Sequence, residues 1–120
     1  MATSATAMRP QTATRPLSIE IGVDLKTGMI VVDPRVVWVS VGSLEEVTWV
    51  CLRRHEHGKD CFTAKFEGPN GSPFTRDTFR HDGVHSGPVR EGVRPTSKLY
   101  EYTLTVPGFG SVYAFAGVEP

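Results

Sequence analysis

The chain has 120 residues, of which 39% are hydrophobic, and this length and composition predict one compact domain with a core of its own. Thirteen basic and thirteen acidic residues cancel to a formal net charge of zero, so no long-range field draws the chain to nucleic acid or to an anionic membrane. We therefore expect neither nucleic acid nor a membrane as a partner.

The first sixteen residues combine Ser, Thr and Ala with two prolines, and they contain no apolar run long enough for a signal peptide. This composition predicts a flexible tail over residues 1–16, followed by a single domain over residues 17–120. The only cysteines are Cys51 and Cys61, which are too few for a secreted disulfide scaffold. We expect a cytoplasmic protein in which both cysteines are free thiols.

Strand signals follow one another along the whole domain. Some segments alternate apolar and polar residues, and others are short runs rich in β-branched or aromatic residues. In chain order these segments are residues 17–25, 29–32, 35–41, 46–52, 61–66, 99–106 and 112–118. Asp33 and Pro34 stop the second of them, because proline has no amide hydrogen for a ladder. No apolar pattern of helical period extends over ten residues.

The remaining segments are rich in polar or turn-forming residues. Residues 53–60 are wholly polar and predict a solvated loop, and residues 74–79 predict irregular structure or a short helix. Residues 83–98 predict a long loop, which is usually either functional or mobile. With seven or eight short strands separated by turns, the fold class is predicted to be all-β, an antiparallel Greek-key β-sandwich. Its core and strand pairs should include the aromatic residues Trp38, Trp49, Tyr100 and Tyr102.

Two motifs carry a resemblance to a known family. From Gly42 to Trp49, a glycine-led turn precedes an alternating strand with an aromatic residue, which resembles a strand motif of the cupredoxins. The pattern Tyr100-x-Tyr-x-Leu is similar to a late strand of the same family. Together with the order of strands, the resemblance covers residues 17–118 and is closest to uncharacterised bacterial cupredoxin-like proteins without a copper centre. It implies a cupredoxin-like sandwich. The alternative is a generic immunoglobulin-like sandwich, although the Cys-to-Trp-to-Cys arrangement of antibody domains is missing.

The copper ligands of the family are not matched in this chain. Copper-binding members place one histidine after the Trp-containing strand, and a cysteine, a second histidine and usually a methionine around the last loop, because copper binds thiolate, imidazole and thioether groups. Residues 103–110 contain none of these ligands, and the position of the first histidine falls near Cys61 or Phe62. The resemblance therefore implies the fold without a type 1 copper centre, and we expect no cofactor.

Two pairs of histidines leave metal binding open as an alternative. His55 and His57 lie on one side of an extended backbone, with Cys61 nearby across the predicted hairpin, and these are ligand types that Zn or Cu accepts. His81 and His85 form the second pair. Exposed imidazoles on a polar loop, or hydrogen bonds at a loop boundary, are the leading interpretation of both pairs.

Basic side chains gather in the segment from residue 76 to residue 98. If the long loop folds over one end of the sandwich, they form a pocket for an anion or a peptide, whereas solubility of the loop is the alternative. The residues predicted for this ligand or partner surface are Arg76, Arg80, His81, His85, Arg90 and Arg94. The acidic pair Glu45 and Glu46 is interpreted as a solvated strand end.

The leading hypothesis for function is a non-catalytic binding or assembly module. Its partner, another protein or a second copy, is expected to meet a sheet edge or the loop over residues 83–98, because an unpaired strand edge can pair with another chain. The alternative is a metal-binding or metal-trafficking domain that uses the loop histidines and a cysteine. A small hydrolase ranks last, because only scattered His, Asp and Glu residues favour it.

Overall fold

The computed structural model describes residues 16–52 and 61–120, which form nine strands. The strands are β2 (Pro16–Val23), β3 (Ile30–Asp33), β4 (Val36–Ser40), β5 (Glu46–Cys51), β6 (Thr63–Lys65), β7 (Thr78–Arg80), β8 (Val84–His85), β9 (Thr96–Val106) and β10 (Gly110–Glu119). The predicted tail, apart from Pro16 in β2, and the predicted loop over residues 53–60 lie outside the described residues. Within the described residues, no helix is long and apolar enough to cross a membrane.

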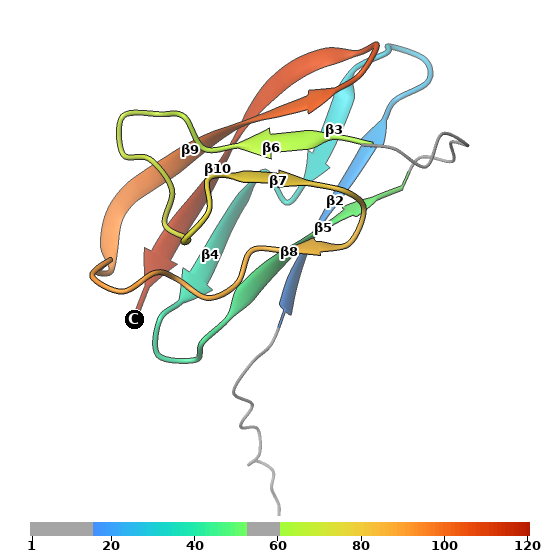
Figure 1. Ribbon diagram of the computed structural model, residues 1–120. Coiled ribbons are helices and arrows are strands. Elements are labelled where there is room, and N and C mark those ends of the chain that lie inside the picture. Colours follow the sequence, from blue (N-terminus) through green and yellow to red (C-terminus); the bar gives the residue numbers. More distant parts are fainter. Residues whose placement is uncertain (1–15, 53–60) are drawn as a thin grey trace, which may run out of the picture.

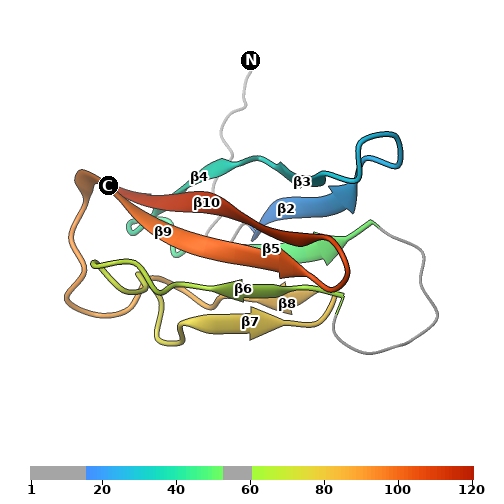
Figure 2. The same ribbon diagram turned by 90° about the horizontal axis from the view of Figure 1, so that it is seen from above.

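The strands form two layers, as Figures 1 and 2 show. One sheet has five strands in the order β4-β10-β9-β6-β7, and the other has four in the order β3-β2-β5-β8. The all-β, two-sheet prediction is therefore confirmed for the described part of the chain. The purely antiparallel arrangement and the smaller strand number are wrong: β4 pairs with β10 in parallel, and β2 pairs with β5 in parallel. Alternation along a strand reports its buried face and not the direction of its neighbour.

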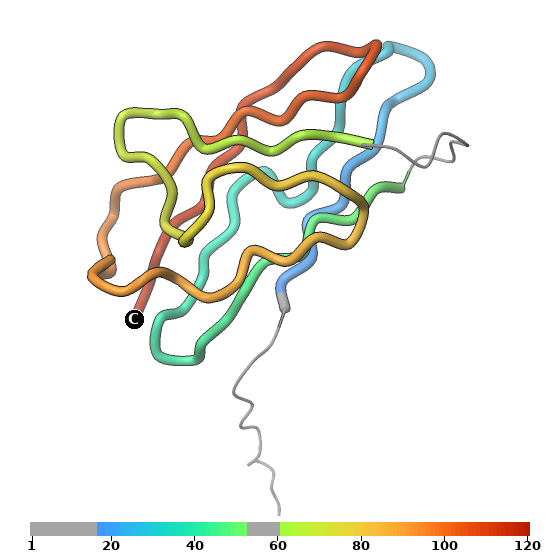
Figure 3. Tube along the Cα trace, in the orientation of Figure 1, coloured from blue at the N-terminus to red at the C-terminus, as the bar shows by residue number. Residues whose placement is uncertain are grey.

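The segment that contains β3 and β4 belongs to both sheets. β3 pairs with β2 in the four-stranded sheet, while β4 pairs with β10 in the five-stranded sheet. Between them lies the cis peptide bond Asp33–Pro34, where the predicted end of β3 is confirmed. Figure 3 traces this passage from one layer to the other. β4 and β5, although consecutive, therefore lie in different sheets.

Aromatic rings fill the space between the sheets. Trp49 stacks on Phe79 with ring centroids 4.7 Å apart, and its indole N–H donates to the Tyr102 hydroxyl at 3.4 Å. Burial raises the pKa of Tyr102 to about 12, because the charged phenolate loses its hydration there. The predicted core positions of Trp49 and Tyr102 are confirmed. Trp38 is a correction: it points outward from β4 and its side chain is partly exposed, since Val37 and Val39 take the inward positions.

Two short strands were not predicted. β7 lies at the end of the segment expected to be irregular or helical, and β8 lies within residues 83–98, expected to be a loop. The same segment also holds an isolated bridge between Phe74 and Val89. Unlike β6, these two strands have no alternating apolar and polar residues on either side. The sequence therefore gives no strand signal, and only the fold brings their hydrogen-bonding partners near.

The expectation of free thiols is wrong, because Cys51 and Cys61 form a disulfide with Cα atoms 6.5 Å apart. Cys51 ends β5 in the four-stranded sheet, and buried Cys61 lies just before β6 in the five-stranded sheet. The bond therefore links the two sheets. The cytoplasmic location stays a prediction.

Glu45 is a further correction, because this residue, directly before β5, is buried and is only 8% exposed. Its Oε1 accepts a hydrogen bond from the Ser40 backbone N–H at 2.9 Å, and its own N–H donates to the Ser40 carbonyl at 3.3 Å. A buried carboxylate is stable here because it accepts a backbone hydrogen bond.

Candidate functional site

The loop over residues 83–98 folds against the segment over residues 72–78. The bridge between Phe74 and Val89 joins the two segments, and the Arg90 backbone N–H donates to the Pro73 carbonyl at 2.9 Å. Together they line an open surface depression of about 510 Å³. Its lining is formed by Ser72, Phe74, Thr75, Arg76, Asp77, Thr78 and Arg90. We call it the two-arginine pocket.

Ser72 organises one wall of the two-arginine pocket. Its hydroxyl accepts from the Phe74 backbone N–H at 3.0 Å and donates to the Arg76 carbonyl at 2.7 Å. Its own carbonyl accepts from Arg90 Nε at 2.9 Å. One buried serine thus holds the backbone near Arg76 and the side chain of Arg90 in place. Sequence reasoning missed Ser72, since serine between glycine and proline is a common turn residue.

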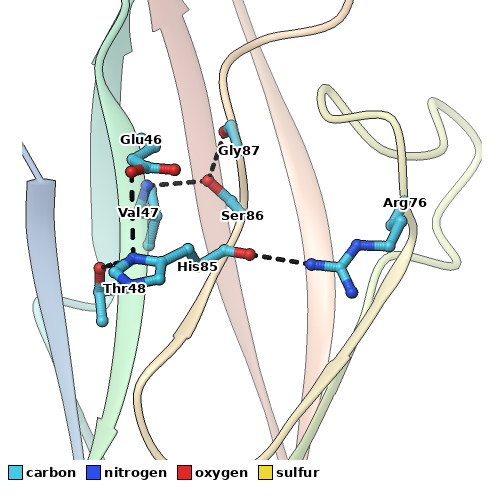
Figure 4. Close-up of polar contacts among 7 residues, drawn as sticks. All are labelled: Glu46, Val47, Thr48, Arg76, His85, Ser86 and Gly87. Atoms are coloured by element: carbon cyan, nitrogen blue, oxygen red, sulfur yellow. Dashed lines mark hydrogen bonds and ion pairs between the residues drawn. The ribbon is translucent and has the colours of Figure 1, made fainter. Parts of the chain in front are cut away.

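Arg76 spans from the segment before β7 to β8, as Figure 4 shows. Its Nη2 donates to the His85 carbonyl at 2.9 Å, and its guanidinium carbon lies 4.9 Å from the centroid of the Phe79 ring. β7 and β8 lie side by side although they belong to different sheets (Figures 1 and 2). Arg76 therefore ties together the two sheets at their short edge strands.

The side chain of His85 faces β5 rather than the pocket. Its Nδ1 lies 2.8 Å from the Thr48 hydroxyl, its register partner on β5, and 4.0 Å from a carboxylate oxygen of Glu46. The next residue, Ser86, is buried; its hydroxyl accepts from the Val47 backbone N–H at 2.8 Å and donates to the Gly87 carbonyl at 2.7 Å (Figure 4). These contacts attach β8 to β5. No sequence signal identified Ser86.

The charges of the two-arginine pocket are unequal. Arg76 and Arg90 bring two guanidinium groups, whereas Asp77 is the one carboxylate residue that the described part of the chain contributes to the lining. A guanidinium has five N–H donors, and the carbonyls of His85 and Ser72 each take one donor from these arginines. The remaining donors suit a planar, bidentate acceptor such as a carboxylate.

The structure brings some of the predicted surface residues together and separates others. Arg76 and Arg90 line the same pocket, and the backbone of His85 contacts Arg76. Arg80 ends β7, His81 occupies the following turn, and Arg94 lies further along the loop, and none of these three lines the pocket. The predicted cluster is therefore divided between the pocket and its surroundings.

The metal alternative rested on His55, His57 and Cys61. Both histidines lie outside the described residues, and the Cys61 sulfur is bonded to Cys51, so it is not a thiolate that could bind zinc or copper while the disulfide is intact. In residues 16–52 and 61–120, no group of three or more His, Cys, Asp or Glu residues is placed to hold a metal ion. His81 and His85 accordingly form no such group there.

Comparison with known proteins adds no relative: no family model, curated protein or solved structure matches the chain.

Proposed function

We propose that this chain is a non-catalytic, cupredoxin-like binding module without a type 1 copper centre, and that its two-arginine pocket takes an acidic segment of a partner protein. The observation that carries the proposal is that two arginines, Arg76 and Arg90, line one surface pocket in which Asp77 is the single carboxylate residue among the described residues. Electrostatic complementarity selects a partner that presents carboxylates.

The cupredoxin-like part of the proposal is supported by the two motifs and their places in the strand order. The motif from Gly42 to Trp49 leads into β5, and the pattern that begins at Tyr100 lies in the middle of β9. In that pattern Tyr102 and Leu104 are buried between the sheets. The turn between β9 and β10 consists of Pro107, Gly108 and Phe109, which offer no imidazole, thiolate or thioether to copper.

The non-catalytic part is supported by the geometry around His85. A catalytic triad needs one ring nitrogen of histidine on the nucleophile and the other on the carboxylate that orients the ring. Here the Thr48 hydroxyl and the Glu46 carboxylate both approach Nδ1. This arrangement suits a cross-strand pair between β5 and β8.

The pocket is built to hold its arginines in place before a ligand arrives. Arg90 is held through Nε by the Ser72 carbonyl, and Arg76 is held through Nη2 by the His85 carbonyl and by the Phe79 ring. An incoming carboxylate therefore orders fewer rotatable bonds than it would at two unrestrained arginines, and this lowers the entropic cost of binding.

The test is an NMR titration of the full chain with a short peptide that contains several Glu residues, and with the same peptide carrying Gln in their place. We expect the Nε–H signals of Arg76 and Arg90 to shift with the Glu peptide and not with the Gln peptide. Added salt should weaken the binding, because part of the lining is open to solvent.

Arg90→Gln should weaken binding of the Glu peptide about tenfold, the loss expected for one charge-assisted contact. Arg94→Gln is the matched control, because it removes the same charge from the same loop outside the pocket. Thermal unfolding of both variants checks that the fold is intact. Equal responses to the two peptides, or equal losses in the two variants, would contradict the proposal.

A further inference from the structure

The described residues leave four sheet edges, formed by β3, β4, β7 and β8. Three of these edges carry polar side chains or a cap. β3 presents Asp33 beside the exposed Val31 on its outward face, β7 presents Arg80, and on β8 the His85 carbonyl accepts from Arg76. Charges and covering side chains of this kind discourage pairing with another strand. The edge of β4 differs from the other three because its strand contains no ionisable residue, and its two outward side chains, Val36 and Trp38, are both apolar.

The backbone groups of β4 divide into two sets. Phe115 N–H donates to the Arg35 carbonyl, and Val41 N–H donates to the Glu119 carbonyl. In a parallel pair, the backbone groups of successive residues point alternately toward the partner strand and away from it. The groups of the odd-numbered residues of β4 point toward β10, so the N–H and C=O groups of Val36 and Trp38 point away from β10. Among residues 16–52 and 61–120, no group bonds to the N–H or C=O groups of Val36 and Trp38.

This unpaired stretch is closed at both ends. Ser40, the next residue with outward-pointing backbone groups, is already bonded through its N–H and its carbonyl to Glu45. At the other end, Pro34 has no N–H to donate. Beyond the three residues from Val36 to Trp38, a longer partner strand therefore gains at most one backbone hydrogen bond, to the Pro34 carbonyl.

Apolar side chains accompany the free backbone groups. Val36 is 40% exposed and Trp38 is 41% exposed, both on the outer face of the five-stranded sheet. Tyr113 of β10, 57% exposed, continues this face two residues before the register partner of Val36. Exposed apolar side chains beside an unpaired edge mark a surface for another chain.

We propose that a second copy of the chain occupies this edge, with the two β4 strands antiparallel about a twofold axis at Val37. In that register, Val36 faces Trp38 of the partner subunit, and Trp38 faces the partner subunit's Val36. The free groups of both residues form about four backbone hydrogen bonds across the axis. The two five-stranded sheets become one continuous sheet.

Two features favour a second copy over an unrelated strand. The free stretch has the same length and the same limits in both copies, so each unpaired N–H and C=O of Val36 and Trp38 meets its counterpart in the other copy. The formal net charge of zero gives two copies no long-range repulsion.

Because β4 and β7 are opposite edges of the five-stranded sheet, the dimer leaves the segment around β7 and the two-arginine pocket open. The proposal is thus independent of the proposed ligand.

The experiment is sedimentation velocity on the full chain over a wide concentration series, with hydrogen exchange measured at low and high concentration. We expect a monomer–dimer equilibrium, with the Val36 and Trp38 amides gaining protection as dimer forms. A monomer at every concentration would overturn the proposal. A dimer that leaves these two amides unprotected would overturn it equally, because another surface would then form the interface.

Two variants test the edge itself. Val36→Pro removes an N–H that the ladder to β10 does not use, and Trp38→Lys places a charge at the interface. Each should weaken the dimer by about tenfold or more, since each removes backbone bonds or apolar contact. Leu25→Lys is the control, because Leu25 is a 91% exposed apolar residue in a turn away from β4. If Leu25→Lys weakened the dimer as much as the edge variants do, the assignment to β4 would be wrong. It would also be wrong if both edge variants kept melting temperatures near that of the original chain and dimerised as strongly as it does.

Discussion

The indole of Trp38 covers Gly117 on the outer face of the five-stranded sheet. The two residues are register partners in the parallel pair of β4 and β10, and a Cβ atom on residue 117 would overlap ring atoms of Trp38. The glycine leaves space that the neighbouring strand fills with an aromatic ring. This pair explains how an exposed tryptophan is kept flat against the sheet beside the proposed dimer edge.

Gly117→Ala should therefore destabilise the protein by about 1–3 kcal/mol, the usual cost of forcing extra volume into a packed site. Denaturant unfolding measures the loss, and tryptophan fluorescence reports displacement of the Trp38 ring. Gly22→Ala is the control, because a Cβ there meets its nearest atom at 4.0 Å. In the background Trp38→Ala, the cost of Gly117→Ala should disappear, and a persistent cost would contradict the role of the ring.

Removing the disulfide should lower stability. Cys51 and Cys61 are separated by ten positions in sequence, and closing a loop of this size restricts the unfolded chain by about 2–3 kcal/mol. The double variant Cys51→Ala and Cys61→Ala should lose this amount in urea unfolding. Reduction of the unaltered chain should have the same effect, and reductant should leave the double variant unchanged. Two titratable thiols in the native, unreduced protein would contradict the bond.

The buried phenol of Tyr102 should make stability depend on alkaline pH. Its pKa is about 12 in the folded protein and about 10 in the unfolded chain, so between these values the folded state holds the proton more tightly. This contribution is fully present below about pH 10, and it declines by about 1.4 kcal/mol per pH unit up to about pH 12. Urea unfolding across this range measures the decline.

Tyr102→Phe should remove that part of the pH dependence, although the indole N–H of Trp49 then loses its acceptor. Tyr113→Phe is the matched control, since the Tyr113 side chain is largely exposed. We expect Tyr113→Phe to keep the decline of the free energy of unfolding between about pH 10 and about pH 12. If Tyr102→Phe kept the same decline, burial of Tyr102 would not be the cause of that pH dependence.

Ser86→Ala should loosen β8 from β5. The substitution leaves the buried N–H of Val47 without its side-chain acceptor, which costs about 1–3 kcal/mol. Hydrogen exchange at the Val47 amide should become faster, and thermal unfolding should shift to lower temperature. Ser18→Ala provides the control, because Ser18 is exposed on β2 of the same sheet. Unchanged exchange at Val47 would show that Ser86 does not hold this edge.

Much of the strand layout is readable from sequence because burial leaves a period of two. In β2 the inward positions Ile19 and Ile21 are fully buried, and in β9 the same is true of Tyr102 and Leu104. The face formed by Phe62, Ala64 and Phe66 around β6 is buried as its alternation predicts. The basic character of residues 76–98 likewise indicated a charged surface, because charge is a property of composition.

The tertiary structure decided which segments meet. Only the fold shows the parallel pairing of β4 with β10, the short strands β7 and β8, the disulfide between the sheets, and the pocket that Arg76 and Arg90 both line. The outward position of Trp38 belongs here too, since an unbroken apolar run does not show which residues face inward. The periodicity of apolar side chains shows which face of a strand is buried, whereas strand partners and pockets depend on the tertiary fold of the whole chain.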